Sequence, residues 1–153
     1  MPMWLVPASG FYEWKRVGGK ARQAYWVRPR DGGAVAFGGL METYMSKDGS
    51  ELDTGCILTV GANRTIGEIH DRMPVVIEPQ NFARWLDCHN GEPRDIVDLM
   101  RPADEDYFEA IPVSDLVNKV ANVGAELQTP VIPAPKKQKP AADKSDDGQM
   151  NLF

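Results

Sequence analysis

His70 and Glu13 are the residues of this sequence whose types and neighbours best suit acid–base chemistry. His70 stands beside Asp71 and Arg72, so an imidazole that titrates near neutral pH lies next to a carboxylate and a guanidinium. Glu13 stands between two aromatic residues, where it could act as a general acid or base. We predict that both are catalytic. A satisfied structural histidine and a solvent-facing strand glutamate are the plainer alternatives.

Two further residues have side chains suited to binding phosphate. Arg72 could hold a phosphate through two parallel hydrogen bonds, unless it forms a salt bridge with Asp71 or another acid. Thr59 could offer its hydroxyl, unless it is an ordinary β-branched strand residue. The sequence contains no zinc-type spacing of Cys and His, no Ser-His-Asp motif and no Gly-rich phosphate loop, so we predict no metal and no cofactor.

Residues 14–30 combine basic and aromatic side chains. The chain carries a formal net charge of −5, yet this stretch holds six basic residues and no acidic one. Rings that stack on bases and cations that follow phosphates are typical of single-strand binding surfaces, so we predict contacts from Trp14 and Arg28. The alternative is a solvated hairpin that turns at Gly18 and Gly19.

The elements that must position these residues are mostly strands. The 153 residues, 42% of them hydrophobic, suffice for one core, and no apolar run is long enough to span a membrane. Asn63 is expected to cap a helix that ends at the His70 turn. Other helices are expected at 79–87, at 95–100 and after Ser114. Alternating and β-rich runs predict strands at residues 4–7, 11–15, 24–28, 35–42, 55–61, 74–77 and 107–113.

Several of these segments together resemble the SOS-response-associated peptidase (SRAP) family, in family order. They are residues 5–15, 36–40, 57–59, 62–63, 69–74, 112–114 and 117–118. The resemblance implies an α+β fold, a strongly curved and barrel-like, mostly antiparallel sheet with peripheral helices. It also implies a role in the DNA-damage response, because family members shield abasic sites in single-stranded DNA by covalent attachment through an N-terminal cysteine.

The resemblance assigns roles to individual residues. Glu13 matches the active-site glutamate and His70 the active-site histidine. Arg72 and Thr59 match contacts to DNA phosphates, and Trp14 matches a position beside the nucleotide pocket.

The sequence also departs from the family pattern. Family members begin with Met-Cys-Gly-Arg and carry a further N-terminal part, whereas position 2 here is Pro2, and Met41 stands where the family usually has tryptophan. We expect the chain to correspond to the C-terminal part of an SRAP protein and to lack the cross-linking nucleophile. It could be a gene fragment, the product of a mis-assigned start, or one half of a protein whose N-terminal half is separately encoded.

The composition changes near Thr129, and residues 130–147 are rich in Pro, Lys and Asp. We predict a partial SRAP domain at 1–129, a disordered linker at 130–147 and a terminal peptide at 148–153. In that peptide Gln149, Leu152 and Phe153 resemble the motif that docks on the bacterial DNA sliding clamp.

The leading interpretation is therefore a cytoplasmic, nucleoid-associated protein that recognises abasic sites in single-stranded DNA. One alternative is a non-catalytic single-stranded-DNA-binding module tethered to the clamp. Another is a peptidase, as the family name suggests, so the sequence leaves open whether the chain is an enzyme.

Overall fold

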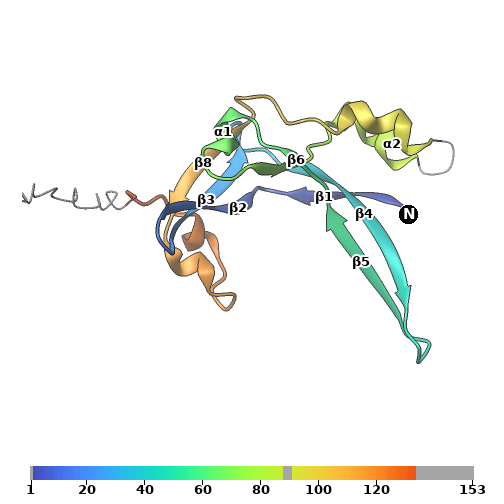
Figure 1. The fold of residues 1–153 in the computed structure, drawn as a ribbon, viewed down its shortest axis with the longest axis horizontal. Helices are drawn as coiled ribbons and strands as arrows, with labels where there is room; N and C mark the ends of the chain where they lie inside the picture. The colour runs from blue at the N-terminus through green and yellow to red at the C-terminus, as the bar shows by residue number, and fades with distance from the viewer. Residues whose placement is uncertain (1, 88–90, 134–153) are drawn as a thin grey trace, which may run out of the picture.

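The computed structural model describes residues 2–87 and 91–133, and this part is built mainly from antiparallel strands (Figure 1). Its strands are β1 (Met3–Ala8), β2 (Phe11–Gly18), β3 (Ala21–Pro29), β4 (Val35–Met45), β5 (Glu51–Ile57), β6 (Thr59–Gly61), β7 (Arg72–Pro74) and β8 (Phe108–Val113). Its helical segments are short: α1 (Arg64–Gly67), η1 (Pro79–Asn81), α2 (Phe82–Leu86), η2 (Pro93–Leu99), η3 (Asp115–Asn118) and η4 (Ala125–Gln128).

The strands form three small sheets in the orders β1-β4-β5, β2-β3-β8 and β6-β7, and each pairing is antiparallel. The predicted α+β class with mostly antiparallel strands is confirmed. The barrel-like closure is wrong for the described residues, because the sheets stay separate. Closure would require the outer strands to pair, whereas every residue of the outer strand β5 is exposed.

The predicted strand at 55–61 is broken at Leu58. Its N–H donates to the carbonyl of Gly38, and its own carbonyl accepts from Val75, both at 2.9 Å. Leu58 is thus bonded on one side to β4 and on the other to the residue that follows β7. The strand predicted at 74–77 is displaced, because β7 spans Arg72–Pro74 and Val76 forms only an isolated bridge with Phe37.

Two clusters of buried side chains hold the sheets together. The first joins Val27 and Phe108 of the β2-β3-β8 sheet to Ile66 of α1 and Met73 of β7. The second surrounds the fully buried Trp85. Because Ile66 and Met73 pack on the same cluster as β3 and β8, the segment between α1 and β7 is fixed against the second sheet.

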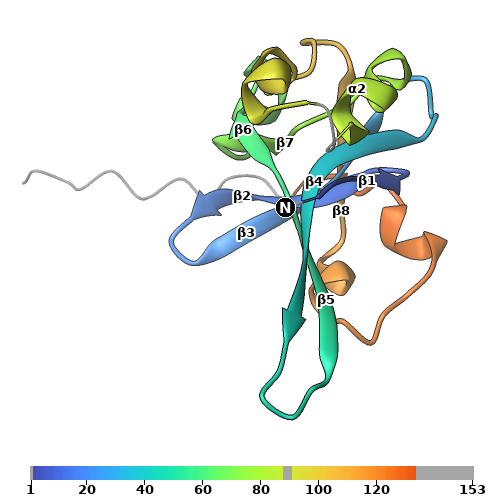
Figure 2. The ribbon, with the colours of Figure 1, turned by 90° about the vertical axis from the view of Figure 1, so that its right-hand side faces the viewer.

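Trp4 sets the base of the β4–β5 hairpin. A Cβ atom at Gly39 or Gly55 would lie 2.1 or 2.2 Å from the indole, so only glycine leaves room for the ring. The Trp4 Nε1–H donates to the carbonyl of Cys56 at 3.4 Å. Beyond this point the hairpin projects from the body (Figure 2), and Tyr44, Met45 and Leu52 are each more than half exposed.

Two expected helices differ from the sequence pattern. The segment predicted at 79–87 starts as the 3-10 turn η1, and Trp85 faces the core while Leu86 is 46% exposed. Ser114 caps its turn through the N–H of Leu116 as expected, but η3 ends at Asn118 and leaves Val120 exposed. No helix in the described part of the chain has the length and apolar character needed to cross a membrane.

Candidate functional site

The turn that carries His70 is anchored by Asn63. Asn63 caps α1 by accepting from the N–H of Ile66 at 2.9 Å, and its amide donates to the carbonyls of Ala103 and Asp104, each at 3.1 Å. The N–H of His70 then bonds to the carbonyl of Ile66 at 3.0 Å. The predicted cap is confirmed, and the turn is tied at both ends.

The imidazole of His70 lies at the surface with a defined orientation. The backbone N–H of Arg72 donates to His70 Nδ1 at 3.0 Å, so in the neutral ring Nδ1 is the acceptor and Nε2 carries the proton. Asp71 Oδ1 lies 3.3 Å from the same Nδ1. That carboxylate can accept from Nδ1 only when the ring is protonated, and it is then the counter-ion of the imidazolium.

Arg72 and Thr59 form one hydrogen-bonded unit. Arg72 Nε and Nη2 donate to Thr59 Oγ1 at 3.2 and 2.9 Å, and Nη2 also bonds to the Thr59 carbonyl. These bonds fix the guanidinium and leave the two N–H groups of Nη1 free. No carboxylate among the described residues forms an ion pair with Arg72, and Asp71 contacts His70 instead. The guanidinium is thus an exposed, oriented cation with donors available for an anion.

Glu13 lies half-buried on β2, the outer strand of its sheet. Its Oε1 accepts from the N–H of Trp14 at 3.0 Å. Side chains alternate along a strand, so Glu13 shares its face with Lys15, whose Nζ lies 3.6 Å from Glu68 Oε2 just before the His70 turn. This ion pair joins the Glu13 face of β2 to the segment that holds His70 and Arg72.

Trp14 and Arg28 lie on the opposite face of the β2-β3 sheet. Trp14 packs beside the Ala24, Trp26 and Val113 cluster, and its Nε1–H donates to Asn118 Oδ1 at 2.8 Å. Arg28 is on the same face by alternation, and its Nε bonds to Glu109 Oε1 at 2.6 Å. The structure therefore gathers Glu13, Thr59, His70 and Arg72 toward one side and leaves the other two predicted contacts apart from them.

Sequence reasoning missed three residues that define this arrangement. They are Glu68, which pairs with Lys15; Asn118, which holds the Trp14 indole; and Glu109, which neutralises Arg28. Their partners stand between 53 and 104 positions away in the chain, so no local spacing pattern could have identified them. The remaining predicted residues, Gln149, Leu152 and Phe153, lie outside the described residues.

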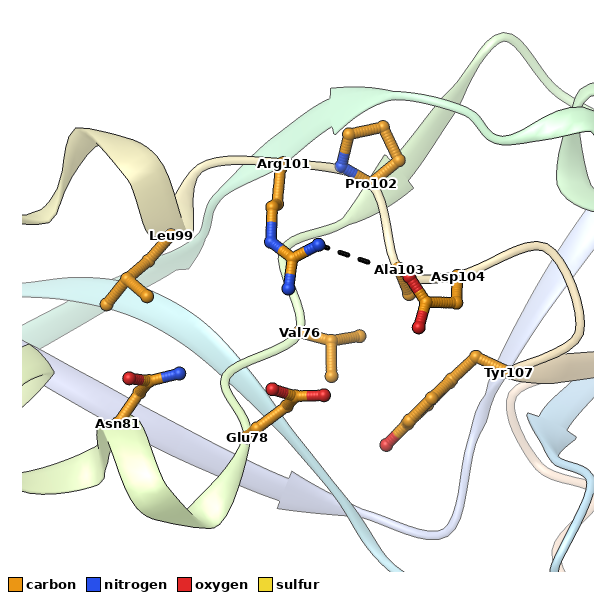
Figure 3. A pocket seen from close by; sticks show the side chains of 9 residues that line it. All are labelled: Val76, Glu78, Asn81, Leu99, Arg101, Pro102, Ala103, Asp104 and Tyr107. Atoms are coloured by element: carbon orange, nitrogen blue, oxygen red, sulfur yellow. Dashed lines mark ion pairs between the residues drawn. The ribbon is translucent and has the colours of Figure 1, made fainter.

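A hollow elsewhere on the surface is lined by none of the predicted residues. Figure 3 shows Glu78, Arg101, Asp104 and Tyr107 around it, with the Arg101 and Asp104 side chains 4.0 Å apart. Burial, and then the nearby carboxylates of Asp31 and Glu78, raises the pKa of Tyr107 above its ordinary value. This phenol is therefore a neutral hydrogen-bonding group at neutral pH.

Within residues 2–87 and 91–133, no cluster of three His, Cys, Asp or Glu side chains could hold a metal ion.

Comparison with known proteins gives one family throughout. The family model described as SOS response associated peptidase (SRAP) matches residues 4–120. The chain is 37% identical over 123 residues to the abasic site processing protein YoqW of Bacillus subtilis (strain 168), covering 80% of this chain and 55% of that protein. It is 31% identical over 159 residues to the abasic site processing protein HMCES of Gallus gallus, covering 90% of this chain and 46% of that protein.

A solved structure shares the fold. A crystal structure of a protein from Bacteroides thetaiotaomicron superposes with a TM-score of 0.76 at 23% identity, over 86% of this chain and 57% of that one. The chain thus spans about half the length of the relatives it matches.

Proposed function

The chain belongs to the SRAP family, and from this premise we propose that it takes part in recognising abasic sites in single-stranded DNA at the bacterial nucleoid. The two relatives, which are 37% and 31% identical to this chain over the aligned residues, are named abasic site processing proteins. The observation that carries the proposal is the Arg72–Thr59 unit. A fixed guanidinium with free donors and no carboxylate partner among the described residues suits a DNA phosphate.

Glu13 and His70 are proposed to serve the chemistry at the sugar. The exposed His70 ring could donate a proton from Nε2 when it is an imidazolium with Asp71 as its counter-ion. The Glu13 carboxylate could accept or return a proton. Both flank the segment in which Arg72 would hold the phosphate, so the acid–base groups and the anchoring group lie on one side of the molecule. A cross-link of the family type would require the N-terminal cysteine of the intact fold.

The β4–β5 hairpin supports a proposal about that N-terminal part. Tyr44, Met45 and Leu52 are 58–66% exposed, and an exposed apolar ribbon is unusual for a free surface. We propose that an N-terminal SRAP half, encoded separately or joined to this chain, covers it. Co-expression of the chain with the N-terminal half of a relative should give one complex on size exclusion. Leu52→Asp should abolish the complex, whereas the control Asp53→Asn should not.

Arg72 provides the direct test of the DNA proposal. Fluorescence anisotropy with an abasic single-stranded oligonucleotide should show binding that weakens with added salt, because phosphate contacts release counterions. Arg72→Ala should weaken binding several-fold, while Arg94→Ala, which removes another exposed arginine that is paired with Glu92, should not. Equal affinities for the wild type and Arg72→Ala would refute the proposed site.

Comparison with an intact oligonucleotide separates the alternatives. Equal affinity for intact and abasic strands would favour the non-catalytic single-strand-binding module, and cleavage of an unfolded protein substrate would favour the peptidase.

The clamp contact of Gln149, Leu152 and Phe153 is a further proposal. Calorimetry of a peptide spanning residues 141–153 against the purified clamp should give micromolar affinity, and a Leu152→Ala, Phe153→Ala peptide should not bind.

A further inference from the structure

The tip of the β2–β3 hairpin is a cluster of exposed cations formed by Arg16, Lys20 and Arg22, which we call the cationic tip. Arg16 and Arg22 stand directly opposite each other in the antiparallel register, and all three side chains are exposed. The chain turns between them at Gly18 and Gly19, where Gly19 has a φ of 53°. The hairpin extends away from the body of the molecule (Figure 2).

The charges of the cationic tip are not balanced by neighbouring acids. Two other cations of this stretch have acidic partners, because Lys15 pairs with Glu68 and Arg28 with Glu109. In the part of the chain that is described, no carboxylate pairs with any residue of the cationic tip. Positive charge is therefore concentrated here, although the chain as a whole carries a net charge of −5.

An opposed arginine pair points to an anionic ligand. Directly opposite side chains have Cβ atoms about 5 Å apart, and like charges in such a pair destabilise the hairpin. An anion between the two guanidinium groups removes that cost. Guanidinium forks match phosphate oxygens in geometry as well as in charge. Trp14, a partly buried aromatic residue, lies on the same face two residues before Arg16, and the exposed part of its ring could stack on a base.

We propose that the cationic tip is a second phosphate-binding surface, which holds the DNA backbone that flanks the Arg72 site. The two arginines lie on the Trp14 face, so the DNA would pass around the outer strand β2 to reach them. The inference rests on the proposed function and extends it to a longer stretch of nucleic acid. Gly18 lies five residues beyond Glu13 on β2, or about 17 Å at the rise of a strand. That length corresponds to about five phosphates along one strand of a duplex.

The test is the salt dependence of binding by the whole chain. Anisotropy of an abasic oligonucleotide would be recorded from 50 to 200 mM salt, with the flank either single-stranded or paired. If both arginines contact phosphates, Arg16→Gln/Arg22→Gln should reduce the slope of log affinity against log salt by about 1.4 on a single-stranded flank or about 1.8 on a duplex flank. An arm whose slope does not change identifies a form of DNA that the cationic tip does not contact.

Matched variants keep the result interpretable. Arg94→Gln/Arg101→Gln removes the same charge from two arginines that have acidic partners and should keep the wild-type slope, as should Arg16→Lys/Arg22→Lys. The glutamine variant of the cationic tip should melt no lower than the wild type, because it relieves a repulsion.

An unchanged slope in Arg16→Gln/Arg22→Gln, with Arg72→Ala still weakening binding, overturns this inference alone. An equal slope loss in the Arg94→Gln/Arg101→Gln control also overturns it, since net charge then explains the effect. Absence of DNA binding by the wild type overturns the proposed function together with it.

Discussion

Replacing Asn63 with alanine should loosen the turn that carries His70 and Arg72. Asn63 is buried, with 7% of its surface exposed, and its side chain makes three hydrogen bonds. It accepts from the N–H of Ile66 and donates to two carbonyls of the segment before β8. The substitution removes all three bonds and leaves those backbone groups without the amide.

The expected loss of stability is about 3 kcal/mol. Removing a helix cap of this type costs about 1 kcal/mol, and each of the two amide donors contributes about 1 kcal/mol net. Asn63→Ser keeps a capping hydroxyl but loses both donors, so about 2 kcal/mol is expected for it. Since a domain of this kind has a total stability of about 5–15 kcal/mol, both variants should remain folded enough to assay.

Urea unfolding followed by tryptophan fluorescence measures the free-energy change, and anisotropy with abasic DNA measures the functional effect. Affinity should fall in the order wild type, Asn63→Ser, Asn63→Ala, because the His70 turn loses its fixed position. A loss below about 1 kcal/mol for Asn63→Ala would show that the cap and the amide bonds do not hold the turn. Wild-type affinity in a clearly destabilised variant would separate the turn from DNA binding.

Three further outcomes are expected. Trp85→Phe should lower the free energy of unfolding by about 2–3 kcal/mol, measured in urea, because it removes the 2.9 Å bond from the indole to the Trp4 carbonyl and leaves a gap in a fully buried site. Glu109→Gln should strengthen binding to single-stranded DNA by releasing the guanidinium of Arg28, and unchanged anisotropy would mean that Arg28 makes no DNA contact. The pKa of Tyr107 is raised above 10.0 mainly by burial, so the stability that its neutral phenol contributes is present below pH 10 and is lost as the pH rises through the folded value. Tyr107→Phe should therefore flatten the loss of stability between pH 9 and pH 11, and a parallel decline in both proteins would contradict this.

The local elements of the fold were predictable because their signals are local. Alternation along β2 and β3, the glycines of their turn and the capping side chains of Asn63 and Ser114 all act within a few residues. The break at Leu58 was not predictable, since it depends on bonds to Gly38 and Val75 from elsewhere in the chain. The sequence pattern of a β-rich run does not show that its two halves pair with different strands.

The site was predictable in its residue types and less so in its grouping. Strand alternation separates Glu13 from Trp14, but contacts from distant parts of the chain decide which face turns toward His70. On the Glu13 face, Phe11 packs against the core cluster of Ile66 and Met73, and Lys15 pairs with Glu68. The sequence alone suggests that Arg28 is an unpaired cation. In the structure it forms an ion pair with Glu109 on the neighbouring strand. Charge balance of this kind depends on strand order, which a single sequence does not display.

Because the β4–β5 hairpin is uncovered, hydrogen exchange of its backbone amides can report whether another protein binds to it. All seven residues of β5 are exposed, and the only strand that pairs with β5 in the described part of the chain is β4. Its amide protons should therefore exchange with deuterated solvent sooner than those of β3, which has a strand on each side. Any protein that seats on the hairpin should slow this exchange without changing the protection of β3. Deuterium uptake across residues 41–57 therefore measures docking without any attached probe or substitution in the chain.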